Sequence, residues 1–262
     1  MYVSKSVKVL FIVFILTMVS FRVLATGGTI REDGLLGYWS FDDLPVDTTP
    51  ASGTVFYDVS GNERHGTLHN DTECVKGIVG NALKFNGLSS YAKIPYNTGL
   101  SSPEAFSIEA WVYPTPPHQN GHNGGIICNI NGREYNRILI RYDNNKLLGY
   151  FSVRPPEGSA TAIEPDGPLI TNMAWNHVVL TCDGIAGKII MYVNGVAGVM
   201  TSFTGDVLTA NYDLTLGWGH TGDNYHYNGL IDEVKIYNRV LSPQEIEAKY
   251  KLFDKNYLIL AL

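Results

Sequence analysis

Short runs of apolar and aromatic residues recur along the chain, separated by glycine, asparagine, aspartate and proline. Several of them alternate apolar and polar positions, as a strand with one buried face does. None of the segments between them has the periodicity of an amphipathic helix. The pattern predicts an all-β sandwich or barrel, with strands over 35–41, 82–85, 92–94, 107–113, 125–130, 137–142, 147–153, 176–182, 188–193, 213–216 and 230–237.

Turn and cap signals separate these strands. Asn194-Gly195 is the strongest hairpin signal, because both residue types tolerate the left-handed backbone of a tight turn. Residues 154–168 are expected to form a long loop. Near the C-terminus, Ser242, Pro243 and Glu245 have the spacing of a helix N-cap, a first helical residue and a capping box. They predict one short helix, followed by an apolar tail over 253–262 that has no assigned structure.

The strand predicted over 230–237 contains an unusual polar position. One side of its alternation carries Leu230, Asp232, Val234 and Ile236, which is the more apolar side and therefore the expected core face. A carboxylate on such a face is unfavourable unless it is paired, hydrogen-bonded or bound to a metal. Asp232 is therefore a candidate for a specific structural or binding role.

The first residues have the pattern of a secretory signal peptide. Lys5 and Lys8 precede an apolar run over 7–19, and Val23-Leu24-Ala25 suits a cleavage site. This predicts a signal peptide over 1–25, a lead-in over 26–34 and a secreted mature protein. The alternative is an uncleaved anchor, although the run is shorter than the roughly 20 residues of a membrane span.

The net charge and the cysteine content limit the classes of partner and of fold that we expect. The formal net charge is −6, and signal cleavage would lower it by the three cations Lys5, Lys8 and Arg22. An acidic domain is a poor partner for nucleic acid, and insertion into a membrane is not expected after cleavage. It is compatible with neutral glycans and divalent cations. The chain has three cysteines, Cys74, Cys128 and Cys182, which are too few for a disulfide scaffold. The sequence does not decide whether two of them form a disulfide and leave one free thiol.

Several motifs, taken in order, resemble the LamG-like family of concanavalin A-like jelly rolls. They are GLLGYWSFDD, DVSGNERHGTL, AFSIEAWVYP, WNHVVLTCDG and YNGLIDEVKIYNRVLSPQEIEAKY. The resemblance covers nearly all of residues 35–250. It implies an all-β, two-sheet antiparallel jelly-roll sandwich with a short C-terminal helix, and we place this domain at residues 35–252.

The resemblance also implies a structural calcium ion. Its ligands would be Asp42, Asn62 and Asp232, with backbone carbonyls near His65 and Gly66. Carboxylate, amide and carbonyl oxygens are suitable ligands for this hard ion. In the alternative interpretation, Asp232 caps backbone amides in a turn and no metal binds.

A glycan-binding surface is the second candidate site. Sugars are recognised by aromatic faces and by polar groups that bond hydroxyls. The candidate ligand-binding residues are Trp218, His220, Asn224, Tyr225 and Arg141. The other tryptophans, Trp39, Trp111 and Trp175, are in strand settings and are expected to be core residues.

Catalysis is the least favoured interpretation. A retaining glycosidase of this fold needs two carboxylates about 5 to 5.5 Å apart, and no E-x-D-x-x-E or E-x-D-x-E string occurs. Glu109 stands alone in its strand. The sequence therefore predicts a secreted, non-catalytic lectin-like or carbohydrate-binding module that binds an extracellular glycan. The alternatives are an adhesive surface protein that binds another protein and, less favoured, a divergent glycoside hydrolase.

Overall fold

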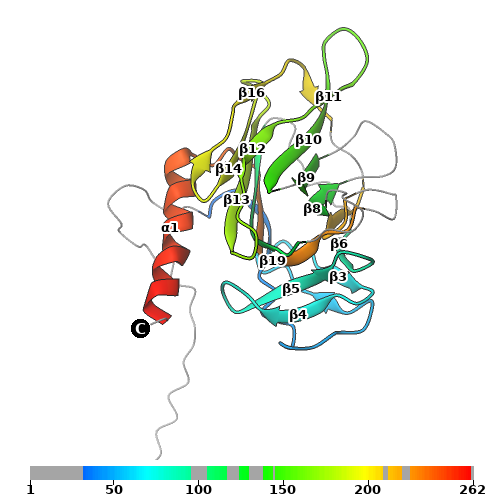
Figure 1. The fold of residues 1–262 in the computed structure, drawn as a ribbon. Coiled ribbons are helices and arrows are strands. Elements are labelled where there is room, and N and C mark those ends of the chain that lie inside the picture. The colour runs from blue at the N-terminus through cyan, green and yellow to red at the C-terminus, as the bar shows by residue number, and fades with distance from the viewer. Residues whose placement is uncertain are drawn as a thin grey trace, which may run out of the picture.

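The computed structural model describes residues 32–95, 105–116, 124–129, 138–143, 145–208, 212–219 and 225–260. These residues form two antiparallel sheets and one C-terminal helix, which confirms the predicted jelly-roll sandwich. Figure 1 shows the helix, α1, along the side of the sandwich next to β13 and β14. The predicted signal peptide lies outside the described residues.

Sheet A has nine strands within the described residues. Its order is β15 (Val196–Ala197), β14 (Lys188–Val193), β13 (Asn176–Asp183), β7 (Ala105–Pro114), β19 (Asn228–Tyr237), β5 (Asn81–Asn86) and β4 (Glu73–Lys76). Two further strands lie outside this order. The strand β1 (Leu35–Trp39) pairs with β19, and β16 (Thr201–Ser202) pairs with β14.

Sheet B has ten strands in the part of the chain that the structure describes. Its order is β11 (Thr161–Ile163), β10 (Lys146–Arg154), β9 (Ile138–Asp143), β8 (Gly124–Asn129), β18 (Leu214–Leu216), β6 (Tyr91–Ile94), β3 (Gly66–His69) and β2 (Val55–Phe56). The strands β12 (Asp166–Leu169) and β17 (Asp206–Val207) also pair with β10. The segment 154–168, expected to be a loop, thus contains β11 and the start of β12.

The main core lies between the two sheets and follows the alternation of their strands. In β7 the inward residues Phe106, Ile108, Ala110 and Val112 belong to this core, and in β10 the inward set includes Phe151. The intervening residues of β7 face outward. Trp39 is fully buried in the core, as expected. All three cysteines are buried and none forms a disulfide.

A bulge in β19 corrects the predicted alternation of this strand. Its register with β7 shifts between Asp232 and Lys235, and Glu233 has a positive φ of 51°. Ile231 therefore faces the main core, while Asp232 pairs with Trp111 on the outward face of sheet A. The assignment of Asp232 to the core face was wrong, because the extra residue of the bulge reverses the alternation.

The helix α1 (Pro243–Leu260) begins as its sequence predicts. Ser242 Oγ accepts a hydrogen bond from the Glu245 amide, and the Ser242 amide donates to the Glu245 carboxylate, which completes a capping box. A second apolar cluster of Val179, Tyr192, Tyr237, Leu241 and Ile246 fixes α1 on sheet A. The helix continues to Leu260, so most of the tail set apart in the sequence is helical.

The hairpin between β14 and β15 confirms the Asn-Gly signal. Asn194 and Gly195 both have positive φ, 51° and 79°, and Val193 pairs directly with Val196. Within the described residues, no helix has the length and apolarity that crossing a membrane requires.

Candidate functional site

A row of aromatic side chains lies on the outward face of sheet B. The rings of His69 and Tyr91 stack with centroids 4.6 Å apart and planes 6° apart. Tyr91 lies 5.2 Å from Trp218, and Trp218 stacks on His226 at 5.8 Å and 11°. All four side chains are half-buried, so parts of their surfaces contact solvent. We call these residues the aromatic row.

Strand alternation points the first two members outward. Leu68 and Ala92 belong to the main core, so their neighbours His69 and Tyr91 face away from it. Burial and the nearby Lys93 lower the pKa of His69 below its ordinary value, which favours a neutral ring at neutral pH. Lys93 itself pairs with Asp213, 3.2 Å away on the same face.

A tight approach of two glycines holds Trp218 in place. A Cβ on Gly125 would lie 2.2 Å from the Cα of Gly219, so no larger residue fits without a backbone shift. The Tyr225 carbonyl accepts hydrogen bonds from the amides of both glycines, at 3.0 and 3.2 Å. Thr215 Oγ1 donates to the Trp218 carbonyl at 2.7 Å. The segment around Trp218 is thereby fixed against β8 and β18.

The structure brings three of the five predicted ligand-binding residues to this region. Trp218 lies in the aromatic row, and Tyr225 positions its segment through the backbone. Arg141 lies on β9 opposite Gly125, and its Nε is buried without a hydrogen-bond partner among the described residues. His220 and Asn224 lie outside the described residues.

Two of the predicted calcium ligands reach one turn, which joins β4 to β5 over residues 77–80. Asp232 Oδ2 accepts hydrogen bonds from the amides of Ile78 and Val79, at 2.9 and 3.2 Å. Asp42 Oδ1 accepts one from the Asn81 amide at 2.8 Å. Burial, and then the charge of Glu233, raise the pKa of Asp232 well above its ordinary value. The turn therefore has a buried carboxylate beside further negative charge.

Asn62 does not lie with these two carboxylates. Its Nδ2 donates to the carbonyls of Leu35 and Leu36, at the start of β1. Asp42 comes shortly after the other end of β1. At that end Trp39 pairs with Val234, beside the bulge in β19 that contains Asp232. No group of three or more His, Cys, Asp or Glu side chains in the described part of the chain is arranged to hold a metal ion.

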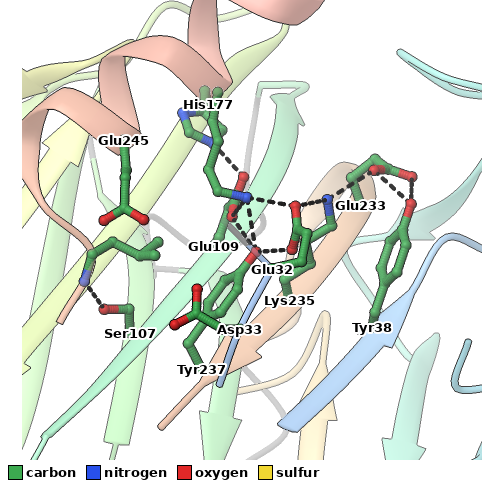
Figure 2. Close-up of polar contacts among 12 residues, drawn as sticks. Glu32, Asp33, Tyr38, Ser107, Glu109, His177, Glu233, Lys235, Tyr237 and Glu245 are labelled. Carbon is green, nitrogen blue, oxygen red and sulfur yellow. Dashed lines mark hydrogen bonds and ion pairs between the residues drawn. The ribbon is translucent and has the colours of Figure 1, made fainter. Parts of the chain in front are cut away.

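Glu109, the residue on which the hydrolase alternative depended, lies in a buried network beneath α1 (Figure 2). Its Oε1 is 3.0 Å from His177 Nε2, and its Oε2 is 3.3 Å from Lys249 Nζ on α1 and accepts a hydrogen bond from Tyr237 at 3.1 Å. It is 2% exposed. Although burial opposes ionisation, Lys249 and His177 lower the pKa of Glu109 far below its ordinary value.

Glu32 extends the network toward solvent, as Figure 2 also shows. Its Oε1 lies 3.0 Å from Lys249 Nζ and 3.9 Å from Lys235 Nζ. Lys235 is in turn 3.6 Å from Glu233, whose carboxylate accepts hydrogen bonds from the Tyr38 hydroxyl. The network connects α1, β1, β7 and β19, and its geometry is that of a structural interface.

The family model described as the concanavalin A-like lectin/glucanases superfamily matches residues 86–247, which is more than half of the chain. The chain belongs to this superfamily. No curated protein sequence matches it. The concanavalin A-like fold is thus supported by both the sequence match and the two-sheet topology.

Three solved structures illustrate the likeness in fold. Domain 4 of AbnA, a GH43 extracellular arabinanase from Geobacillus stearothermophilus in complex with arabinotriose, is 23% identical with a TM-score of 0.56, covering 82% of this chain and 97% of that one. The binding domain of Paraclostridial Mosquitocidal Protein 1 is 17% identical with a TM-score of 0.65, covering 85% and 53%. The receptor binding domain of botulinum neurotoxin D is 16% identical with a TM-score of 0.62, covering 84% and 53%. The chain thus spans about half of these two toxin domains.

Sequence reasoning missed three members of the aromatic row, His69, Tyr91 and His226, since only Trp218 was among the predicted ligand-binding residues. His69 lies on β3, which the strand pattern did not predict, and Tyr91 immediately precedes the predicted strand 92–94. Their proximity to Trp218 depends on β3, β6 and β18 being neighbours in this sheet, which the sequence does not show. One expected core residue also differs, since Trp175 is half-buried.

Proposed function

We propose that this protein is a secreted, non-catalytic carbohydrate-binding protein whose ligand stacks on the aromatic row of sheet B. The single observation that carries the proposal is the continuous row formed by His69, Tyr91, Trp218 and His226. Half-buried aromatic rings offer apolar faces to the C–H side of a sugar. Neighbouring Lys93 and Asp213, both partly exposed, supply groups that can bond hydroxyls.

Two further facts support binding over hydrolysis. The fold neighbour from the arabinanase was solved with arabinotriose, an uncharged oligosaccharide. In this chain Glu109 is buried beneath α1 and engaged by a lysine, a histidine and a tyrosine. A carboxylate held ionised and covered in this way is unsuited to donating a proton to a glycosidic oxygen.

A glycan microarray tests the proposal. We expect binding to at least one class of neutral glycan, and roughly a fivefold weaker signal for Trp218→Ala, because stacking on one aromatic ring contributes on the order of 1 kcal/mol. Trp175→Phe, on the opposite sheet, is the matched control and is expected to bind as the unmodified protein does. Recovery from the culture medium of a chain beginning at Thr26 tests secretion.

We also propose that Asp42 and Asp232 hold a structural calcium ion. Both residues supply hard oxygen donors at the 77–80 turn, and the buried Asp232 lies beside Glu233, so that a divalent cation would reduce repulsion there. Such an ion would fix the β4–β5 turn to β19. Asn62, bonded to the start of β1, is not part of the proposed ligand set.

Thermal unfolding with and without calcium tests this ion. We expect millimolar Ca²⁺ to raise the Tm by several degrees relative to EDTA, since a ligand of the native state stabilises it by mass action. The shift should disappear in Asp232→Asn and persist in Asn62→Ala. Equal Tm values in Ca²⁺ and EDTA would exclude the ion.

A further inference from the structure

An ion pair on the outward face of sheet B lies next to the aromatic row. Lys93 Nζ and Asp213 Oδ2 are 3.2 Å apart. Lys93 follows Tyr91 by two positions on β6, so strand alternation places both side chains on the same outward face. Two residues of a strand span about 7 Å, a distance comparable to the width of one sugar ring. A sugar that lies on the row can therefore reach the pair.

Strand pairing fixes the position of Lys93 relative to the row. Lys93 pairs with Thr67 of β3 on one side and with Thr215 of β18 on the other, so these three residues cross the sheet beside the aromatic row. Thr215 Oγ1 donates to the Trp218 carbonyl, which connects the two lines of residues. Burial, and then the charge of Lys93, lower the pKa of His69. The ammonium group is therefore close enough to the row to act on it electrostatically.

Both members of the pair are accessible to a ligand on the surface. The side chain of Lys93 is 38% exposed and that of Asp213 is 40% exposed. An ammonium group carries three N–H donors, and an ionised carboxylate has two acceptor oxygens with several lone-pair sites. Their mutual contact engages one donor and one oxygen, so the pair presents donors and acceptors side by side.

We propose that Lys93 and Asp213 together recognise two adjacent hydroxyls of a sugar on the aromatic row, and thereby select neutral oligosaccharides with a free vicinal diol. This inference rests on the proposed glycan binding and adds the class of ligand. Lys93 donates to the oxygen of one hydroxyl, and Asp213 accepts from the other hydroxyl. Adjacent hydroxyl oxygens are spaced much as the two charged atoms are.

The same pair disfavours anionic glycans. Asp213 compensates the charge of Lys93 at 3.2 Å, so the surface beside the row has no net positive charge with which to attract a uronate or a sulfate. A lysine without this partner would have the opposite preference. Asp213 is therefore the residue that determines the selection of neutral ligands.

A microarray with three sets of probes tests the inference. The first set contains neutral oligosaccharides, arabinotriose among them, the second contains deoxy counterparts that lack one of two adjacent hydroxyls, and the third contains oligosaccharides with uronate or sulfate groups. We expect the unmodified protein to bind the first set best. The deoxy set should bind roughly tenfold more weakly, the factor that one hydrogen bond to a charged group contributes at the lower end of its range.

Two variants change the pair in different ways. Lys93→Met removes the donor, so binding of the neutral set should fall roughly tenfold without a gain for the anionic set. Asp213→Asn leaves Lys93 uncompensated, so binding of the anionic set should rise roughly two- to fivefold, the size of one exposed ion pair. Glu73→Gln is the matched control. It breaks the exposed pair with Lys84 on sheet A, 3.0 Å apart, and changes the net charge equally.

The outcomes separate this inference from the function on which it rests. Neutral glycan binding that falls in Trp218→Ala but is unchanged in Lys93→Met would overturn the role of the pair and leave the aromatic row in place. An anionic signal that rises equally in Asp213→Asn and Glu73→Gln, or a preference of the unmodified protein for anionic glycans, would also overturn it. No binding of any glycan by the unmodified protein would overturn both proposals. Far-UV circular dichroism checks that each variant is folded.

Discussion

Lys249 places a positive charge in the interface between α1 and sheet A, where only 2% of the residue is exposed. Its Nζ contacts Glu109, Glu32 and the Tyr237 hydroxyl within 3.3 Å. Removing one member of such a buried group leaves the opposite charge without compensation, which is more unfavourable than the pair itself is favourable. The sequence showed Lys249 only as one charged residue of a predicted helix.

We therefore expect Lys249→Met to reduce the free energy of unfolding by about 3–5 kcal/mol, because Glu109 would remain buried and unpaired. Urea unfolding at neutral pH measures this loss. Lys251→Met is the matched control: its pair with Glu247 is exposed on the same helix, and its loss should be below about 1 kcal/mol. Similar losses for the two variants would contradict a structural role for the network.

Glycine has a steric role at the turn that Asp42 and Asp232 reach. A Cβ on Gly80 would lie 1.8 Å from Asp42 Oδ1, and Gly80 also has a positive φ of 53°. Gly61 has a positive φ of 89° but nothing within 4 Å of its Cβ position. The two positions therefore share the backbone requirement and differ in the space around them.

Gly80→Ala is expected to destabilise the protein by at least about 1 kcal/mol more than Gly61→Ala, because only Gly80→Ala displaces the Asp42 carboxylate as well as straining the backbone. Chemical unfolding of the two variants gives the comparison. If both lose the same free energy, the contact between Asp42 and the turn is not tight.

At the scale of elements, the longer strands and the start of α1 could be predicted, and most shorter strands could not. Alternation identified β7, β10, β13, β14 and β19 within a few residues of their bounds. Short strands such as β2 and β11 carry too little pattern, and they form because a distant strand offers hydrogen bonds. The bulge in β19 was invisible, since an added residue changes the facing of Asp232 without changing composition.

The residues of the candidate site could likewise be predicted only in part. Trp218 was recognised as an aromatic face for sugar stacking in a glycine-flanked segment, and Arg141 as a guanidinium on a strand face that could bond hydroxyls. Tyr91 is in the row because β6 lies beside β18, a pairing of segments more than 100 residues apart. The convergence of Asp42 and Asp232, without Asn62, likewise depends on where β1 ends, which a single sequence does not specify.

At the scale of the whole molecule, two buried groups give stability opposite dependences on pH. The pKa of Glu109 is lowered by folding, so its stabilisation is present above its ordinary pKa of 4.5 and is lost as pH falls below that value. The pKa of Asp232 is raised, so its contribution is favourable at acid pH and is lost as pH rises above 3.8 toward the raised pKa.

The difference in stability between the unmodified protein and Lys249→Met isolates the first group. We expect this difference to be largest near neutral pH and to narrow as pH falls, because without Lys249 the pKa of Glu109 is less lowered and the folded variant takes up a proton there while the unmodified protein keeps Glu109 ionised. Urea unfolding across pH 3 to 7 measures it. A difference that widens with acidification would have the wrong sign for an ionised Glu109 held by Lys249.

The two faces of the sandwich also differ in chemistry. Sheet A carries α1, the buried charge network and an aromatic cavity, whereas sheet B presents the aromatic row with polar neighbours. We propose that glycans bind on sheet B, so substitutions on the outward face of sheet A that keep the fold should leave glycan binding unchanged.

The most direct test of the central claim compares the unmodified protein with Trp218→Ala and Trp175→Phe on one neutral-glycan microarray. The account predicts binding that falls roughly fivefold in Trp218→Ala and persists in Trp175→Phe. Binding that is absent from the unmodified protein, or unchanged in a folded Trp218→Ala variant, would contradict the aromatic row as a glycan-binding site.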